Sequence, residues 1–186
     1  MANQYPNILP EHEEFIKNQH VFFVGSAPTY SDGHVNVSPK GYDSLRILSS
    51  TEVAYLDLTG SGNETSAHVE ENGRITFMFC AFSGNPLILR LFGTGQAILP
   101  GTREWNQLIQ HFDMMPGARQ IIYAKIHLVQ TSCGYGVPLM EYTKERDTLH
   151  RWAEKKGEDG LEEYRKDKNS VTIDGLPTPI GQTITR

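Results

Sequence analysis

The feature that most constrains the fold of this chain is a hairpin signal near its N-terminus. Residues 20–28 (HVFFVGSAP) form an apolar run with strand propensity, and residues 35–38 (VNVS) alternate between apolar and polar side chains, as a half-buried strand does. Asp32-Gly33 between the two runs is a favoured hairpin turn. We therefore expect residues 21–27 to pair antiparallel with residues 35–38. Pro39 is expected to end the second strand, because proline lacks a backbone donor.

Beyond the hairpin, strand-like runs are separated by turns and not by regularly spaced long helices. Further strands are expected over residues 53–58, 74–82, 87–99 and 120–130. Helices are expected over residues 10–19, 66–72 and 102–115, and a single helical turn over residues 43–48. These elements predict a mainly β fold, a six-stranded antiparallel Greek-key-type barrel with flanking helices. They disfavour a doubly wound sheet.

The whole chain, residues 1–186, is expected to form a single domain. Residues 20–133 are predicted to form the barrel core and residues 137–170 a charge-rich helical extension. Within that extension, helices are predicted over residues 140–156 and 158–167. Residues 171–186 are predicted to be a polar tail.

Composition excludes several classes of function. The formal net charge is −5 and no basic patch is interleaved with aromatic residues, so nucleic acid is not an expected partner. No apolar run reaches the roughly 20 residues of a membrane span, and the first residues lack the features of a secretory signal. The chain has only two cysteines, so a reducing, cytoplasmic location is expected. No HExxH or CxxC motif supports a metal site.

Three stretches carry candidate binding groups, each with an ordinary structural alternative. Lys40 lies between Pro39 and Gly41, so it is either a fixed cation at the mouth of the sheet or a solvated lysine. Gly60–Thr65 joins a strand to a helix start, where unpaired N–H groups favour an anion, or it is a plain helix entry. Arg90 lies in an apolar run, so its guanidinium requires a carboxylate or a ligand phosphate.

Two glycine-containing stretches are interpreted more simply. Cys133 precedes Gly134 in the segment SCGYGVP, and no motif pairs this cysteine with a particular histidine. We therefore favour a glycine-rich loop that shapes a pocket over a cysteine nucleophile. Gly93 and Gly95 lie inside a strand pattern, which predicts a bulge or a close approach, most simply a bend of the barrel.

Taken together, four segments of the chain resemble one protein family. They are HVNVSPKGYDSLRIL, VAYLDLTGSGNETSAHVEENGRITFMFCAF, ILRLFGTGQA and TSCGYGVPLMEY. They resemble the pyridoxamine 5′-phosphate oxidase-like family of FMN-binding split β-barrels, and within it the oxidase-related branch of unassigned activity. The resemblance covers roughly residues 20–175. It implies a homodimer with two FMN molecules in grooves between the protomers.

The resemblance also assigns cofactor-binding residues but no catalytic ones. The strand ending in Lys40 and the strand end at Leu58-Thr59 would run along the flavin, and Asn63-Glu64-Thr65 would face its phosphate. The candidate FMN-binding residues are Val35, Asn36, Val37, Ser38, Lys40, Leu58, Thr59, Gly60, Gly62, Asn63, Glu64, Thr65, Arg90, Cys133 and Gly134.

The chain departs from authentic oxidases at three places. Glu64-Thr65 stands where they carry an arginine–lysine pair for the phosphate, and Ile88 stands where they carry a glutamine. Their C-terminal tryptophan and arginine have no counterpart here. Oxidation of pyridoxamine phosphate is therefore disfavoured. The groups expected to hold the phosphate instead are Lys40, Arg90, the backbone N–H groups near Gly62 and the hydroxyls of Ser38 and Thr65.

Three functions follow from these observations. The first is an FMN-dependent oxidoreductase that acts on an unknown small molecule, in which the flavin carries the electrons. The second is a non-catalytic protein that binds flavin or another small molecule on the same barrel. The third is a dimerisation module without a cofactor.

Overall fold

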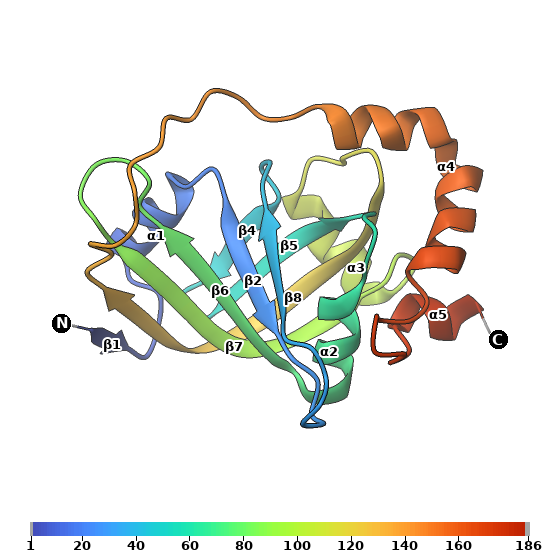
Figure 1. Cartoon of the computed structure of the whole chain (residues 1–186), viewed down its shortest axis with the longest axis horizontal. Helices are drawn as coiled ribbons and strands as arrows, with labels where there is room; N and C mark the ends of the chain where they lie inside the picture. Colours follow the sequence, from blue (N-terminus) through green and yellow to red (C-terminus); the bar gives the residue numbers. More distant parts are fainter. Residues whose placement is uncertain (1, 185–186) are drawn as a thin grey trace.

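The chain is built on a strongly curved antiparallel sheet with helices at its ends and edges (Figure 1). The structure is a computed structural model that describes residues 2–184. The eight-stranded sheet has the order β3-β2-β6-β7-β8-β5-β4, with the short β1 paired to β8. The strands are β1 Asn3–Tyr5, β2 Phe22–Ser26, β3 Asn36–Lys40, β4 Leu45–Ser49, β5 Glu52–Leu58, β6 Arg74–Cys80, β7 Ile88–Ile98 and β8 Ala118–Ser132.

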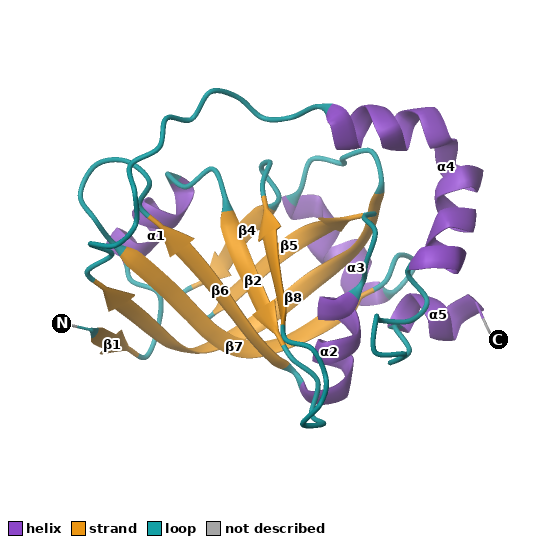
Figure 2. Cartoon of the chain, viewed as in Figure 1, coloured by secondary structure: helices purple, strands orange, loops and turns teal. Residues whose placement is uncertain are grey.

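The helices lie around this sheet and are all short except one (Figure 2). They are α1 Pro10–Lys17, α2 Glu64–Asn72, α3 Arg103–Leu108 with a 3₁₀ turn at Ile109–His111, α4 Thr148–Lys168 and α5 Pro179–Ile184. Helix α2 packs against β2, β6 and β7. Helices α4 and α5 contact each other at the end of the molecule opposite β1.

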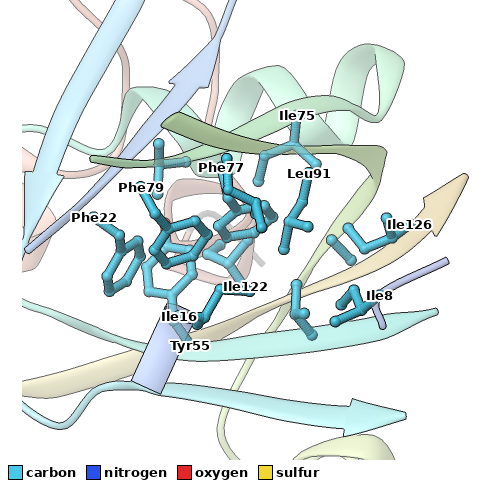
Figure 3. Close-up of a cluster of buried hydrophobic side chains, with 14 of the residues drawn as sticks. Ile8, Ile16, Phe22, Tyr55, Ile75, Phe77, Phe79, Leu91, Ile122 and Ile126 are labelled. Carbon is cyan, nitrogen blue, oxygen red and sulfur yellow. The ribbon is translucent and has the colours of Figure 1, made fainter. Parts of the chain in front are cut away.

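The inner face of the curved sheet holds the main hydrophobic core (Figure 3). Phe22 packs edge-on against Tyr55, with ring centroids 5.8 Å apart, and stacks with Phe79 at 5.9 Å. On the other side of β5 and β8, Leu56 belongs to a second cluster with Trp105. The alternation of residues 53–58 thus separates two cores.

The predicted fold class is confirmed, with eight strands in place of six. Two strands were missed. β1 is three residues long and β4 occupies residues that we predicted to be a helical turn. The bend expected near Gly93 is present, because the register between β7 and β8 shifts between Phe92 and Gly93.

The end of the N-terminal hairpin differs from the prediction in two ways. Pro39 lies inside β3 and pairs with Phe23 of β2. β3 is an edge strand, so the missing N–H of the proline costs no hydrogen bond of the sheet. Val35 and Val37 are not half-buried but 72% and 63% exposed, because the described chain places no layer over them.

The helix predicted over residues 102–115 is shorter than expected. Thr102 caps its start, since the Thr102 hydroxyl oxygen accepts the Trp105 N–H at 3.1 Å. The helix ends at Leu108, and Phe112 has an extended backbone. This change of direction buries the Phe112 ring in the second core.

The C-terminal region also differs from its prediction. Residues 140–147 were predicted as helix but are an irregular segment, and α4 begins only at Thr148. The Tyr42 hydroxyl donates to the Arg146 carbonyl at 2.7 Å, and the rings of His20 and Tyr142 stack with centroids 3.6 Å apart. The predicted boundary between two helices coincides with a kink at Gly157, where φ is 66°.

The predicted polar tail packs against the rest of the protein. Asn169 and Thr178 are fully buried, and α5 follows them. The Thr178 hydroxyl donates to the Asn169 carbonyl at 2.6 Å. The buried polar side chains of this region are therefore bonded internally, whereas Gln182 and Thr183 are exposed.

Candidate functional site

A cavity of about 370 Å³ opens at the end of the barrel between β3, the end of β5 and the start of α2. We call it the β3–α2 cavity. Its volume lies within the roughly 300–1,000 Å³ range of small-molecule sites. The predicted site residues that line it are Asn36, Ser38, Lys40, Leu58, Gly60, Gly62, Asn63, Glu64 and Thr65. Pro39, Asp57, Ser61 and Arg119 line it as well.

β3 and β5 contribute side chains to this cavity in different ways. Asn36, Ser38 and Lys40 are every second residue of β3, so their side chains lie on the same face of the strand. In β5 the pairing with β8 shifts register between Asp57 and Leu58. Such a bulge changes the alternation of side chains, and both Asp57 and Leu58 line the cavity.

A buried carboxylate, Asp57, organises the charges of the cavity. Its Oδ1 accepts Lys40 Nζ at 2.8 Å, and its Oδ2 accepts Arg119 Nε and Gln120 Nε2, both at 2.8 Å. Burial alone would raise the pKa of Asp57, but the Arg119 guanidinium, the Lys40 ammonium and the bonds from Lys40 and Gln120 hold it well below its usual range. Asp57 is therefore ionised and paired with two cations.

Gln120 connects this carboxylate to the start of α2. Its amide nitrogen also donates to Asn63 Oδ1 at 2.7 Å, and its oxygen accepts the Ser66 hydroxyl at 3.0 Å. Asn63 is the N-cap residue of α2, but its side chain makes no capping bond. It instead donates to the Asn169 carbonyl at 3.3 Å. The helix start is thus positioned from β8 and the C-terminal region, not by a local cap.

The C-terminal region supports the same corner of the barrel. Arg119 Nη1 donates to Asn169 Oδ1 at 2.8 Å, and Asn169 Nδ2 donates to the Gly60 carbonyl at 3.0 Å. Arg165 of α4 donates to the Thr59 hydroxyl at 2.9 Å. Thr59 is itself buried beneath the cavity wall and does not line it. These bonds fix the Gly60–Asn63 loop between β5 and α2.

Lys40 is held at the cavity, but it is not a free cation. Its side chain is 23% exposed and bonded to Asp57, and its ammonium lies 5.4 Å from the centroid of the Tyr55 ring. The alternative of a freely solvated lysine is therefore wrong. An anion in the cavity would share Lys40 with Asp57.

The hydroxyls expected near a phosphate are present and linked. Asn36 Nδ2 donates to the Thr65 hydroxyl oxygen at 3.0 Å, and the Ser38 hydroxyl donates to Asn36 Oδ1 at 3.1 Å. Glu64, the first residue of α2, accepts the Ile173 N–H at 3.2 Å. Burial raises the pKa of Glu64, the Ile173 bond opposes this rise, and Asp174 adds to it.

The remaining predicted residues lie elsewhere. Arg90 in β7 donates to the Ser132 hydroxyl at 3.3 Å, and in the described chain no carboxylate lies within ion-pair distance of it. Cys133 is exposed, and Gly134 has a φ of 65° at a position where a Cβ would lie 2.9 Å from the Leu87 backbone nitrogen. Within one chain, Arg90, Cys133 and Gly134 do not line the β3–α2 cavity. Their predicted role in binding FMN stays a prediction.

Sequence reasoning missed several residues of the site. Gln120 is the first residue of the strand predicted over residues 120–130, and Arg119 lies just before that prediction, although β8 includes it. Asn169 lies near the end of the predicted helical extension and is fully buried. The available signal was the alternation of residues 53–58, which places Asp57 on the same face as the buried Tyr55. A buried carboxylate requires cations, but the sequence does not say which cations reach it.

Among residues 2–184 no helix is long and apolar enough to cross a bilayer. The same residues contain no group of three or more His, Cys, Asp or Glu side chains arranged to hold a metal ion.

Comparison with known proteins gives a match over most of the barrel. The family described as pyridoxamine 5′-phosphate oxidase matches residues 8–133. The "Pyridoxamine 5′-phosphate oxidase family protein ustO" of Aspergillus flavus is 41% identical over 197 residues, covering 93% of this chain and 76% of that protein. This chain belongs to the pyridoxamine 5′-phosphate oxidase family.

Solved structures share the fold at lower sequence identity. The H111A variant of HupZ from Group A Streptococcus has a TM-score of 0.54 and 21% identity, over 67% of this chain and 99% of that chain. A candidate pyridoxamine 5′-phosphate oxidase from Lactobacillus delbrueckii has a TM-score of 0.52 and 16% identity, over 67% of this chain and 94% of that one. At these identities the similarity shows the fold alone.

Proposed function

We propose that this member of the pyridoxamine 5′-phosphate oxidase family is an FMN-binding flavoprotein and an FMN-dependent oxidoreductase that acts on a small molecule. The observation that carries the proposal is the β3–α2 cavity, whose lining residues come from β3, from the end of β5 with the start of α2, and from Arg119 of β8. Most of the residues that the family resemblance assigned to FMN meet there. Family membership makes a flavin the expected occupant.

The chemistry of the cavity fits the phosphate end of FMN. Lys40 and Arg119 supply two cations, and the Ser38 and Thr65 hydroxyls lie nearby. The first turn of α2 adds N–H groups that have no partner within the helix, and these favour an anion. When bound, the flavin supplies the electron transfer. The residues of the chain hold the phosphate end, orient the cofactor and balance its charge.

We further propose that the protein is a homodimer and that the outer face of the sheet contributes to the contact. Phe23, Met78, Phe92 and Leu128 are half-buried residues of four neighbouring strands that alternate with fully buried ones. Val37 of the edge strand continues this face and is 63% exposed. An apolar face of this kind is typical of subunit contacts. Sedimentation of a single 20.9 kDa species at micromolar concentration would contradict the dimer.

The cofactor proposal is tested on the purified full-length chain. We expect flavin absorbance bands in protein purified without added cofactor, or saturable quenching of FMN fluorescence on titration. A protein that neither carries nor binds any flavin would refute the proposal and favour the cofactor-free dimerisation module.

Catalysis is tested separately on the loaded protein. Reduction of the bound flavin by a nicotinamide donor without oxygen, followed by reoxidation in air, is expected for an oxidoreductase. A bound flavin that no nicotinamide donor reduces would favour the alternative, a non-catalytic flavin-binding protein. We propose a cytoplasmic location, where such donors are available.

A further inference from the structure

The β3–α2 cavity contains a carboxylate whose position opposes the charge of the proposed ligand. Glu64 lines the cavity at the first position of α2, next to the N–H groups that would bind an anion. Its half-buried side chain is fixed, because Oε1 accepts the Ile173 N–H at 3.2 Å. A dianionic phosphate in this corner would lie beside a second negative group.

The two cations of the cavity offset this repulsion only in part. Lys40 and Arg119 both bond to Asp57, whose pKa is held low, so part of their charge is already balanced. The cavity therefore presents two cations and two carboxylates. Its affinity for an anion depends on whether Glu64 is charged.

We propose that Glu64 determines the selectivity of the cavity between phosphorylated and phosphate-free flavins, because its ionised carboxylate repels the phosphate of FMN. The inference rests on the proposed flavin function and adds a specificity residue to it. In the ionised state Glu64 weakens binding of FMN but not of riboflavin, which lacks the phosphate. Once protonated, it no longer repels the phosphate.

The groups around Glu64 determine how this effect depends on pH. Burial already raises the pKa of Glu64 in the free protein, and Asp174 of the C-terminal region raises it further. Asp174 is bonded to His34 and raises the pKa of that imidazole. Asp57, which is paired with Lys40 and Arg119, stays ionised between pH 5 and 8 because its pKa is held well below its usual value. Comparing variants at the same pH separates Glu64 from His34 and from the phosphate itself.

The test measures dissociation constants of FMN and riboflavin by flavin fluorescence between pH 5 and 8. Three proteins are compared, namely the unmodified chain and the variants Glu64→Gln and Glu70→Gln. The glutamine side chain of Glu64→Gln retains an oxygen that can accept the Ile173 N–H, so the fold is kept. Glu70 is an exposed residue of the same helix outside this cavity, and its replacement removes one equal charge.

At pH 8 we expect Glu64→Gln to bind FMN about tenfold more tightly than the unmodified chain. Such a change corresponds to about 1.4 kcal/mol of repulsion between the ionised Glu64 carboxylate and the phosphate. The gain should decrease as the pH falls towards 5, and riboflavin affinity should stay the same throughout. Glu70→Gln should leave the ratio of FMN to riboflavin affinity within about twofold of the unmodified chain.

Different failures have different signatures. If both flavins bind but Glu64→Gln leaves their affinity ratio unchanged at pH 8, the inference is overturned while the flavin function stands. The same holds if Glu70→Gln has an equal effect. If none of the three proteins binds either flavin, the proposed function fails and the inference fails with it.

Discussion

Replacing Asp57 with asparagine tests whether this buried carboxylate stabilises the barrel end. The side chains of Asp57 and Arg119 are only 3% and 4% exposed, and Lys40 is the third member of the cluster. Asparagine keeps the shape of aspartate but removes the charge. Arg119 would then be a buried guanidinium without a carboxylate, because its other recorded bond goes to the neutral Asn169.

The expected loss follows from the burial of the two cations. Removing one partner of a buried ion pair costs about 3–5 kcal/mol. The Lys40 side chain is 23% exposed and regains some hydration, whereas Arg119 does not. We therefore expect a loss near the lower limit, about 3 kcal/mol. With a urea dependence of about 2 kcal/mol per molar, this lowers the unfolding midpoint by about 1.5 M.

The assay is urea unfolding followed by tryptophan fluorescence at pH 7 and at one fixed protein concentration. Asp43→Asn is the matched control, since it breaks the exposed Asp43–Arg46 pair and should cost less than about 1 kcal/mol. A loss below about 1 kcal/mol for Asp57→Asn would refute the reasoning, because it would show that Arg119 needs no anion.

The difference between the unmodified chain and Asp57→Asn should also depend on pH. The pKa of Asp57 is lower in the folded protein than in the unfolded chain, where it is about 3.9. A carboxyl of this kind contributes its full stability above the unfolded pKa and loses it as the pH falls further. The stability gap between the two proteins should therefore be constant from pH 7 to about pH 5 and narrow below about pH 4.

Three further predictions concern the same region. Lys40→Ala and Arg119→Ala should each weaken FMN binding roughly tenfold to a hundredfold relative to riboflavin binding, because a charge-assisted hydrogen bond contributes about 1.5–3 kcal/mol. Fluorescence titration measures both affinities. Arg90→Ala should have the same effect only if a partner chain brings Arg90 to the phosphate. Gly73→Ala should destabilise the protein by at least about 1 kcal/mol in thermal unfolding, because φ is 72° and the added Cβ would lie 2.8 Å from the Thr94 methyl; Gly60→Ala, which meets nothing within 4 Å, should be nearly neutral. Asn169→Ala should cost about 1–3 kcal/mol in urea unfolding, because buried polar partners of Asn169 lose their bonds; an effect below about 0.5 kcal/mol would show that water replaces them.

The sequence predicted those elements whose side chains follow a local pattern. The alternation of residues 53–58 and the turn residues Asn72-Gly73 gave the positions of β5 and of the end of α2. β4 was missed because its residues from Leu45 to Leu48 are all half-buried, so it has no alternation of polar and apolar faces. β1 was missed because it is three residues long and is ordered by its pairing with β8.

The site was predicted only as far as its residues are adjacent in sequence. Residues 36–40 and 58–65 belong to the segments that carry the family resemblance, and the fold brings them together. Arg119 is 62 residues from Asp57, and Asn169 is a further 50 residues along the chain. No local pattern reports contacts of this length. The same limit explains why the C-terminal residues were predicted only as a polar tail, with no packing against the barrel.

The charge pairing around Asp57 predicts that a cavity with two cations does not behave as a simple anion site. Asp57 lies opposite Gln120 in the sheet, so its carboxylate is fixed by the backbone pairing of β5 with β8. Lys40 and Arg119 must reach it from β3 and β8, and this keeps both cations at the cavity wall in the absence of any ligand. A phosphate would therefore meet two cations whose side chains are already held in place, but it would have to share both of them with Asp57. The carboxylate that organises the cavity thus also limits its affinity for phosphate, which leaves Glu64 as the group whose protonation changes that affinity most.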